Sequence, residues 1–170
     1  MDPQTVNQKT ASRLQRIMTS STIPSPRYLG IDFGLKRVGL AVAGPNSTMV
    51  FPLKTIFRTT RAALFEELLG IIAEENIQAI VLGLPLDLEG NEQLITRQVR
   101  NFAASLARRV ALPIHLENEA LTSFEARNRL HEARVFGARR KNVLDQMAAV
   151  AILESFLSRH HHHGSLHRPQ

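Results

Sequence analysis

The chain has 170 residues, of which 44% are hydrophobic and 21% are charged, values that are typical of one globular domain with a core of its own. It contains no cysteine, which excludes disulfides, thiolate metal sites and a cysteine nucleophile, and it has no run of about 18 apolar residues that would span a membrane. The formal net charge of +6 favours a polyanionic partner, nucleic acid first.

The ends of the chain differ in composition from its middle. Residues 1–26 are rich in Ser, Thr, Gln and Asn, and they predict a flexible arm. The arm is poor in acidic residues, so an organelle transit peptide is the alternative to a cytoplasmic location. Residues 159–170 contain four consecutive histidines and predict a disordered tail. The predicted domain, residues 27–158, carries 16 basic and 14 acidic side chains and is only mildly basic.

Within the domain, apolar segments and turn residues predict a mixed α/β order. The first three predicted strands are separated by connections too short for a helix, so they are expected to be antiparallel neighbours. Helices and strands then alternate, as parallel strands require. The predicted strands are residues 28–33, 37–43, 49–57, 78–83 and 112–117, and the predicted helices are residues 60–75, 92–109, 122–134 and 142–158. This order predicts a five-stranded mixed sheet flanked by helices.

The last two predicted helices have distinct signals. Thr122 and Glu125 form a capping-box pattern that opens the first of them. Residues 147–153 are apolar on every side, which predicts that the last helix is buried against the sheet.

Three acidic residues occupy positions where an apolar element meets a turn. Asp32 ends the first predicted strand, Glu119 follows the last one, and Asp145 lies near the start of the last predicted helix. Each also has an ordinary interpretation. Asp32 is then a turn residue, Glu119 a solvated loop acid, and Asp145 a first-turn acid that complements the helix dipole behind an Asn142 cap.

The three acids together favour metal chemistry, because strand ends and a helix start can meet at one edge of an α/β sheet. Carboxylates suit Mg²⁺ or Mn²⁺, which prefer oxygen ligands. Two such ions about 3.5–4 Å apart can activate water and stabilise the leaving oxygen in phosphodiester cleavage. Gly30 and Gly34, on either side of Asp32, are expected to allow close approach by a phosphate or a metal-bound ligand.

Four blocks of sequence resemble the motifs of one known family, in the family's order, across residues 27–157. The blocks are residues 28–42 (YLGIDFGLKRVGLAV), residues 81–102 (beginning VLGLPL), Glu119 with Leu121-Thr122-Ser123, and Asp145 with the apolar residues 148–153. They resemble the YqgF family, also called RuvX, which comprises Holliday-junction-resolvase-like proteins of the ribonuclease H superfamily.

The resemblance implies a ribonuclease H-like fold and a metal-dependent nuclease with Asp32 and Asp145 among its Mg²⁺ or Mn²⁺ ligands. It further implies a role in maturing the 5′ end of the precursor of the small-subunit (16S) ribosomal RNA, with resolution of branched DNA as the alternative.

The third block departs from the family pattern at two positions. Asn118 stands where the family has Asp, and Ala120 stands where it has Arg. An amide is a poorer metal ligand than a carboxylate, so Glu119 is expected to serve instead. A catalytically impaired nucleic-acid-binding relative is therefore a second hypothesis. A third, an ATP-binding protein of the actin and sugar-kinase type, shares the Gly-Ile-Asp-Phe-Gly strand but needs two such domains.

Basic residues near the three acids are the expected contacts to nucleic acid. Aromatic residues are few and fall mostly in apolar patterns, so recognition is expected to depend on phosphates and shape rather than on a stacking platform. We expect precursor RNA, or branched DNA, to be bound by a monomer or a weak homodimer. The predicted nucleic-acid-binding residues are Lys36, Arg37, Arg100, Arg139, Arg140 and Lys141.

Overall fold

The structure is a computed structural model that describes residues 25–87, 89–119 and 138–163, without the side chains of residues 138–141 and 161–163. Most of the predicted arm, the predicted helix at residues 122–134 with its capping box, and residues 164–170 lie outside the described residues. Among the described helices, none has a stretch long and apolar enough to cross a membrane.

The described residues form one five-stranded sheet in the order β3-β2-β1-β4-β5. β1, β2 and β3 pair antiparallel, whereas β4 pairs parallel with β1 and β5 pairs parallel with β4. This arrangement confirms the predicted mixed sheet, with three antiparallel strands followed by parallel ones. The strands are β1 (Tyr28–Phe33), β2 (Arg37–Ala43), β3 (Val50–Phe57), β4 (Ala79–Leu84) and β5 (Ile114–Asn118).

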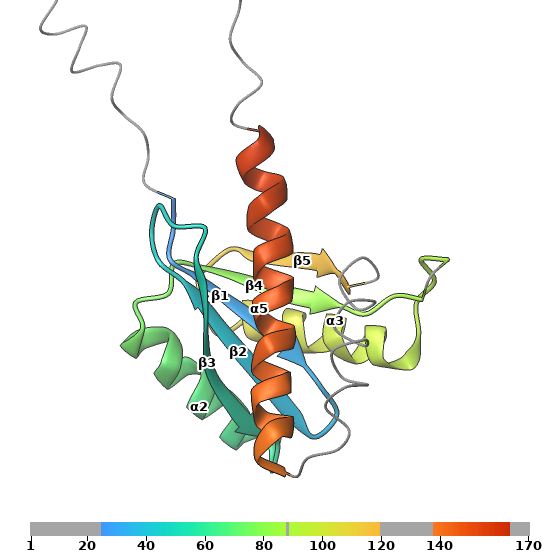
Figure 1. Cartoon of the computed structure of the whole chain (residues 1–170). Helices are drawn as coiled ribbons and strands as arrows, with labels where there is room; N and C mark the ends of the chain where they lie inside the picture. Colours follow the sequence, from blue (N-terminus) through green and yellow to red (C-terminus); the bar gives the residue numbers. More distant parts are fainter. Residues whose placement is uncertain (1–24, 88, 120–137, 164–170) are drawn as a thin grey trace, which may run out of the picture.

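Helices cover both faces of the sheet (Figure 1). α2 (Arg61–Glu74) and α3 (Leu94–Ala107) lie behind it, and α5 (Ala138–His163) crosses the front. α2 begins after Thr60, whose hydroxyl accepts a 3.1 Å hydrogen bond from the Ala63 amide. α2 connects β3 to β4, and α3 connects β4 to β5. Both helices lie on one face of the sheet, as two right-handed crossovers in the same direction require.

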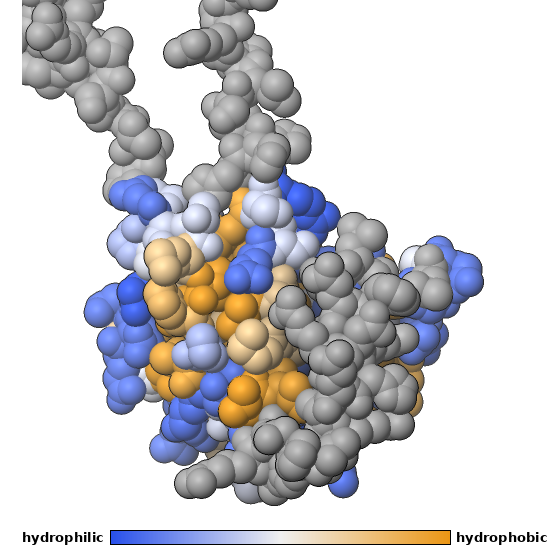
Figure 2. Space-filling view, in the orientation of Figure 1, coloured by the Kyte–Doolittle hydropathy of each residue, from blue (hydrophilic) through white to orange (hydrophobic). Residues whose placement is uncertain are grey.

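The pleat of the strands divides the core into two layers. Leu29, Ile31 and Phe33 of β1 pack with the apolar residues of α2 and α3. The intervening positions of β1 face α5, where the Tyr28 ring lies 5.5 Å from that of Phe156. Because side chains alternate between the two faces of a strand, every second residue of β1 belongs to the α5 layer. Figure 2 shows apolar surface over α5 and the neighbouring β3, whose exposed apolar side chains include Phe51 and Met147.

Glycines allow α5 to approach the sheet closely. A Cβ atom on Gly30 would lie 2.9 Å from both the Ala149 carbonyl oxygen and the Leu153 Cβ. A Cβ atom on Gly39 would overlap the backbone carbonyl of Asp145. The prediction that Gly30 makes room for a phosphate or metal-bound ligand is therefore wrong, because the helix itself fills that space.

α5 is longer at both ends than the predicted helix over residues 142–158. It begins at Ala138, so Asp145 lies about two turns into the helix, and its interpretation as a first-turn acid with an Asn142 cap is wrong. At the other end, the Phe156 and His160 rings stack at 3.9 Å, and the helix continues through His163. The first histidines of the predicted tail are therefore helical.

We predict that Gly39→Ala lowers the free energy of unfolding by about 2–3 kcal/mol, because the added methyl group forces α5 away from the sheet. Gly70→Ala is the matched control. Gly70 lies within α2, and a Cβ atom there would meet no atom within 4 Å, so alanine should stabilise the helix by about 0.5–1 kcal/mol. Urea denaturation of both variants measures the difference. Equal effects of the two substitutions would contradict the close contact at Gly39.

Candidate active site

Asp32 lies on the α5 face at the end of β1. It follows Tyr28 and Gly30 at two-residue intervals, and both of these contact α5. The side chain is partly buried, because Asp32 is paired with Gly39 of β2 and α5 lies against that part of the sheet. The strand thus places a carboxyl group in the layer between sheet and helix.

Asp145 reaches the same place from α5. Asp32 is paired with Gly39 across the antiparallel β1–β2 ladder, and the backbone of Asp145 rests on Gly39. Arg37 Nε lies 2.8 Å from Asp145 Oδ2. The Oδ2 atom is buried and has no well-aligned hydrogen-bond donor among the described residues, so the contact with Arg37 is an ion pair of imperfect geometry.

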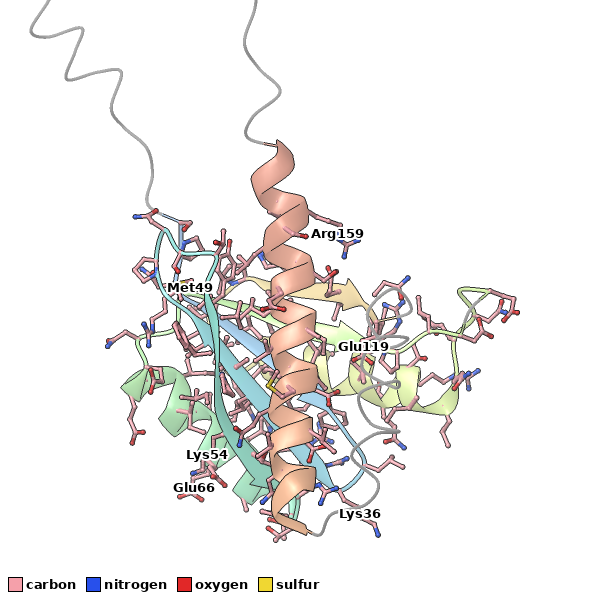
Figure 3. All side chains as sticks on the ribbon, viewed as in Figure 1. Lys36, Met49, Lys54, Glu66, Glu119 and Arg159 are labelled. Atoms are coloured by element: carbon pink, nitrogen blue, oxygen red, sulfur yellow. The ribbon has the colours of Figure 1, made fainter. Side chains whose placement is uncertain are left out.

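Glu119 approaches from the other side of β1. It directly follows β5, and a Cβ atom on Gly83 of β4 would overlap the Glu119 carboxylate. Gly83 belongs to the α5 layer, because the same Cβ atom would also meet Ile152 at 2.5 Å. Figure 3 shows Glu119 at the ends of β4 and β5, beside α5. The three predicted acids therefore lie on one face of the sheet, at the end where β1 and β4 finish.

Burial raises the pKa values of all three carboxyl groups, and neighbouring charges add to its effect at Asp32 and Glu119. Burial and the negative charge of Asp145 raise the pKa of Asp32 to about 6, and burial and the charge of Asp32 raise the pKa of Glu119 to about 8. Burial also raises the pKa of Asp145, although its ion pair with Arg37 acts in the opposite direction. Asp32 is thus the central member of the cluster. Burying several like charges is unfavourable unless a cation or protons neutralise them.

The donor set fits a hard divalent cation, although the side chains do not converge on one point. Among the described residues, no three His, Asp or Glu side chains lie close enough to ligate a single ion. The oxygens are nevertheless of the type that Mg²⁺ and Mn²⁺ prefer, and the buried Asp145 Oδ2 lacks an aligned donor. These residues would hold a metal ion after side-chain adjustment, with Asp145 turning from Arg37.

Asn118, the departure from the family pattern, lies on the other face of the sheet. It is paired with Leu84 in the parallel β4–β5 ladder, and Leu84 belongs to the core under α2 and α3. Paired residues of neighbouring strands point to the same face. Asn118 therefore points away from the acidic cluster, whereas Glu119 reaches it, so the amide does not replace a ligand of this cluster.

The predicted basic residues are distributed unequally. Lys36 is exposed in the β1–β2 turn, at the same end of the sheet as the acids (Figure 3). Arg37 reaches the cluster directly through Asp145. Arg100 does not, because it lies on α3 and pairs with Glu92 at 2.6 Å. The backbone of residues 139–141 forms the start of α5, and the side chains of Arg139, Arg140 and Lys141 lie outside the described residues.

The prediction from sequence did not include Gly39 and Gly83, which make room for Asp145 and Glu119. Glycine inside an apolar strand is a sequence signal for close approach of another segment, and both residues have it. The approaching segment was not evident from the sequence, since it comes from far along the chain.

Comparison with known proteins agrees with the resemblance. The sequence model of RuvX, described as Holliday junction resolvase, matches residues 26–159. The chain belongs to the RuvX family. Two relatives, each named "Putative pre-16S rRNA nuclease", come from Maridesulfovibrio salexigens and Oleidesulfovibrio alaskensis. The first is 55% identical over 133 residues, which cover 78% of this chain and 98% of the relative. The second is 52% identical over 132 residues, which cover 78% and 92%.

Among solved structures, RuvC of T. thermophilus in complex with a Holliday junction substrate matches with a TM-score of 0.49 and 14% sequence identity. The match covers 82% of this chain and 97% of that one. Membership of the RuvX family confirms the predicted enzyme class, a nuclease.

We predict that Asp32→Asn stabilises the protein at pH 8 in the absence of divalent ions. The pKa of Asp32 in the folded state, about 6, exceeds the unfolded value of about 4. Folded chains therefore bind this proton more tightly, and stability falls as the pH rises from about 4 through 6, with Glu119 extending the fall to about pH 8. The gain should be about 3 kcal/mol, since the shift is about two pKa units and one unit corresponds to about 1.4 kcal/mol.

Urea denaturation in EDTA at pH 5 and pH 8 measures this gain. Asp87→Asn is the control, because Asp87 lies on the loop before α3 and the hydrogen bond from the Asn91 amide lowers its pKa. This control should give no gain at pH 8. A stability that is the same at both pH values, for the unaltered chain, would contradict the charge repulsion.

We also predict that Asn118→Asp leaves metal-dependent cleavage within about twofold of the unaltered chain, because a carboxylate on the opposite face of the sheet adds no ligand to the cluster. Rates measured over a range of Mg²⁺ or Mn²⁺ concentrations test this. A large gain in activity, or a clear fall in the metal concentration needed, would show that Asn118 does occupy a ligand position.

Proposed function

We propose that this chain is a divalent-metal-dependent nuclease that processes the 5′ end of precursor 16S ribosomal RNA. The observation that carries the proposal is the meeting of Asp32, Glu119 and Asp145 on one face of the sheet, where burial raises all three pKa values and a neighbouring carboxylate raises those of Asp32 and Glu119 further. The names of the two relatives give the substrate. In bacteria such as these, the ribosomal precursor is cytoplasmic, and the proposal places the chain there.

Asp32, Glu119 and Asp145 would hold one or two Mg²⁺ or Mn²⁺ ions. When bound, such ions lower the pKa of an attacking water and offset charge on the leaving oxygen of the phosphodiester. Asp32 is the fixed ligand, because it lies within β1, which pairs with β2 over its whole length and with β4 as far as Ile31. Glu119 is the adjustable one, since it lies just beyond the end of β5.

The basic residues beside the acids have separate roles in this proposal. Arg37 holds Asp145 by an ion pair, and it becomes available to a substrate phosphate if the Asp145 carboxylate turns toward a cation. Lys36 is exposed at the neighbouring turn and can bind a phosphate as a point charge. Binding should weaken steeply with salt, because these contacts are to the backbone of the nucleic acid.

Resolution of four-way DNA junctions is the second candidate, and the description of the matching family favours it. Both substrates present a phosphodiester that the same carboxylates can act on. What distinguishes them is the path of the nucleic acid over the surface around the cluster.

We predict that Asp32→Asn reduces metal-dependent cleavage by at least about 100-fold while RNA binding in EDTA is retained, because the change removes a carboxylate that would hold the metal ion. Glu119→Gln and Asp145→Asn should behave in the same way. Asp87→Asn, which changes an acid on the loop before α3, is the matched control and should cleave like the unaltered chain.

The assay follows a 5′-extended 16S precursor and a four-way DNA junction side by side, with and without Mg²⁺ or Mn²⁺. Faster cleavage of the precursor supports the first candidate, and faster cleavage of the junction supports the second. Cleavage by Asp32→Asn at the normal rate would overturn the assignment of the active site, and tight binding without cleavage of any substrate would overturn the proposed activity.

A further inference from the structure

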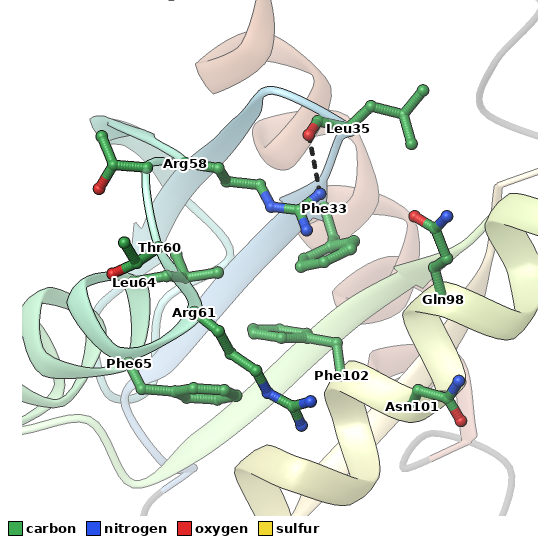
Figure 4. A pocket seen from close by; sticks show the side chains of 11 residues that line it. Phe33, Leu35, Arg58, Thr60, Arg61, Leu64, Phe65, Gln98, Asn101 and Phe102 are labelled. Atoms are coloured by element: carbon green, nitrogen blue, oxygen red, sulfur yellow. Dashed lines mark hydrogen bonds between the residues drawn. The ribbon is translucent and has the colours of Figure 1, made fainter.

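A cavity of about 400 Å³ lies on the other side of β1 from the acids. Phe33, which directly follows Asp32, contributes to its wall, together with the β3–α2 connection and one side of α3 (Figure 4). Its volume falls in the range of small-ligand sites and is too small for a base-paired duplex. The cavity therefore accepts one unit of a polymer or one small molecule.

The cavity is positively charged. Of the residues that the structure describes, Arg58 and Arg61 line it and no acidic residue does. Along residues 25–87, 89–119 and 138–163, neither guanidinium group has a carboxylate partner. Arg58 lies in the β3–α2 connection and Arg61 is the first residue of α2, whose first turn contains no acid. Two cations with no acidic neighbour favour an anionic ligand.

The arginines are held in place rather than free in solvent. Arg58 Nη1 donates hydrogen bonds of 2.7 and 2.9 Å to the carbonyl oxygens of Gly34 and Leu35, and its guanidinium lies 4.4 Å above the Phe33 ring. Arg61 donates to the Ser105 hydroxyl. Guanidinium groups fixed in this way lose less entropy when they bind a phosphate.

The remaining lining is suited to a nucleobase. The Phe33 and Phe102 rings stack at 4.4 Å, and Phe65 stacks on Phe102 at 5.5 Å. These rings belong to the core, as expected from the sequence, but they also form the apolar floor of the cavity. Gln98 and Asn101 reach the cavity from α3 (Figure 4), and their amides can hydrogen-bond to the edge of a base.

We propose that this cavity, here called the Arg58–Arg61 pocket, binds one unpaired nucleotide of the substrate strand next to the cleaved phosphodiester. The inference rests on the proposed nuclease function and adds a substrate preference to it. Asp32 and Phe33 are successive residues at the end of β1 with side chains on opposite faces, so one strand passing this end of the sheet can reach both. The pocket thereby selects substrates with a single-stranded segment at the cleavage site.

The test measures binding of a single-stranded RNA oligonucleotide and an RNA duplex by fluorescence anisotropy in EDTA. Arg61→Gln should weaken single-strand binding by about tenfold, the effect of one lost charge-assisted contact, and should weaken duplex binding much less. Arg97→Gln is the matched control, since Arg97 is an exposed arginine of α3 that does not line the pocket, and it should change neither affinity by more than about twofold.

A second variant does not depend on the contact between Arg61 and Ser105. Asn101→Trp keeps every charge, alters an exposed residue of α3 and fills the pocket, so it should also weaken single-strand binding by about tenfold. If both variants bind the single strand as tightly as the unaltered chain does, the proposal is overturned. Equal losses for single strand and duplex would also overturn it, because the arginines would then act only as general positive charge.

Titration with AMP distinguishes a strand-bound nucleotide from a free one. An oligonucleotide that binds much more tightly than AMP supports the proposal, whereas AMP binding of equal affinity, lost in Arg61→Gln, would assign the pocket to a free nucleotide and overturn it. None of these measurements involves cleavage, so the two proposals can fail separately. A chain that cleaves no substrate can still bind a single strand in the pocket. A chain that cleaves, and whose variants bind single strands like the unaltered chain, keeps its proposed function and loses only the pocket.

Discussion

The contact between α5 and the glycines of the sheet determines where the acidic groups lie. Gly39 receives the backbone of Asp145, and Gly83 receives the carboxylate of Glu119. Larger residues at these two positions would separate the helix and the β5 end from β1, and Asp32 would then lie alone. The same contact also removes water from around the carboxyl groups, which is why their pKa values rise.

The acidic cluster is therefore unfavourable for folding and is retained by the core around it. The α5 layer includes Ile152, Leu153 and Phe156, each at most 3% exposed, packed on Val81 and Ala43. This apolar contact holds the helix in place although it brings like charges together. A site that costs stability in the absence of its ligand is common where function requires charge in a buried position, and a divalent cation would remove the cost.

One strand end connects two different surfaces. The pleat of β1 directs Asp32 toward α5 and Phe33 toward α2 and α3, so an acidic cluster and a basic cavity lie back to back. Arg58 and Arg61 therefore form no ion pair with the three acids, unlike Arg37, which lies on the acids' face of the sheet. Separated by the strand, the acids can hold cations while the arginines remain available to phosphate, and a single nucleic-acid strand can engage both.

Much of this protein follows from its sequence alone. Alternation of apolar residues and short turns predicts the three antiparallel strands, and the four motif blocks predict the family and the three acids. These are local signals, since strand period and turn chemistry depend on neighbouring residues. The length of α5 was predicted less well, because its end is stabilised by contacts such as the ion pair of Arg159 with the buried Glu117, a residue of β5.

The tertiary structure decided which residues meet. Asn118 and Glu119 are adjacent in sequence, and no local pattern shows that one pairs with Leu84 over the α2–α3 core while the other covers Gly83. Arg37 is basic by sequence, and its partner Asp145 lies more than a hundred residues away. The Arg58–Arg61 pocket likewise joins three separate segments. Register and helix docking determine such contacts, and both depend on how distant segments pack, which no short stretch of sequence contains.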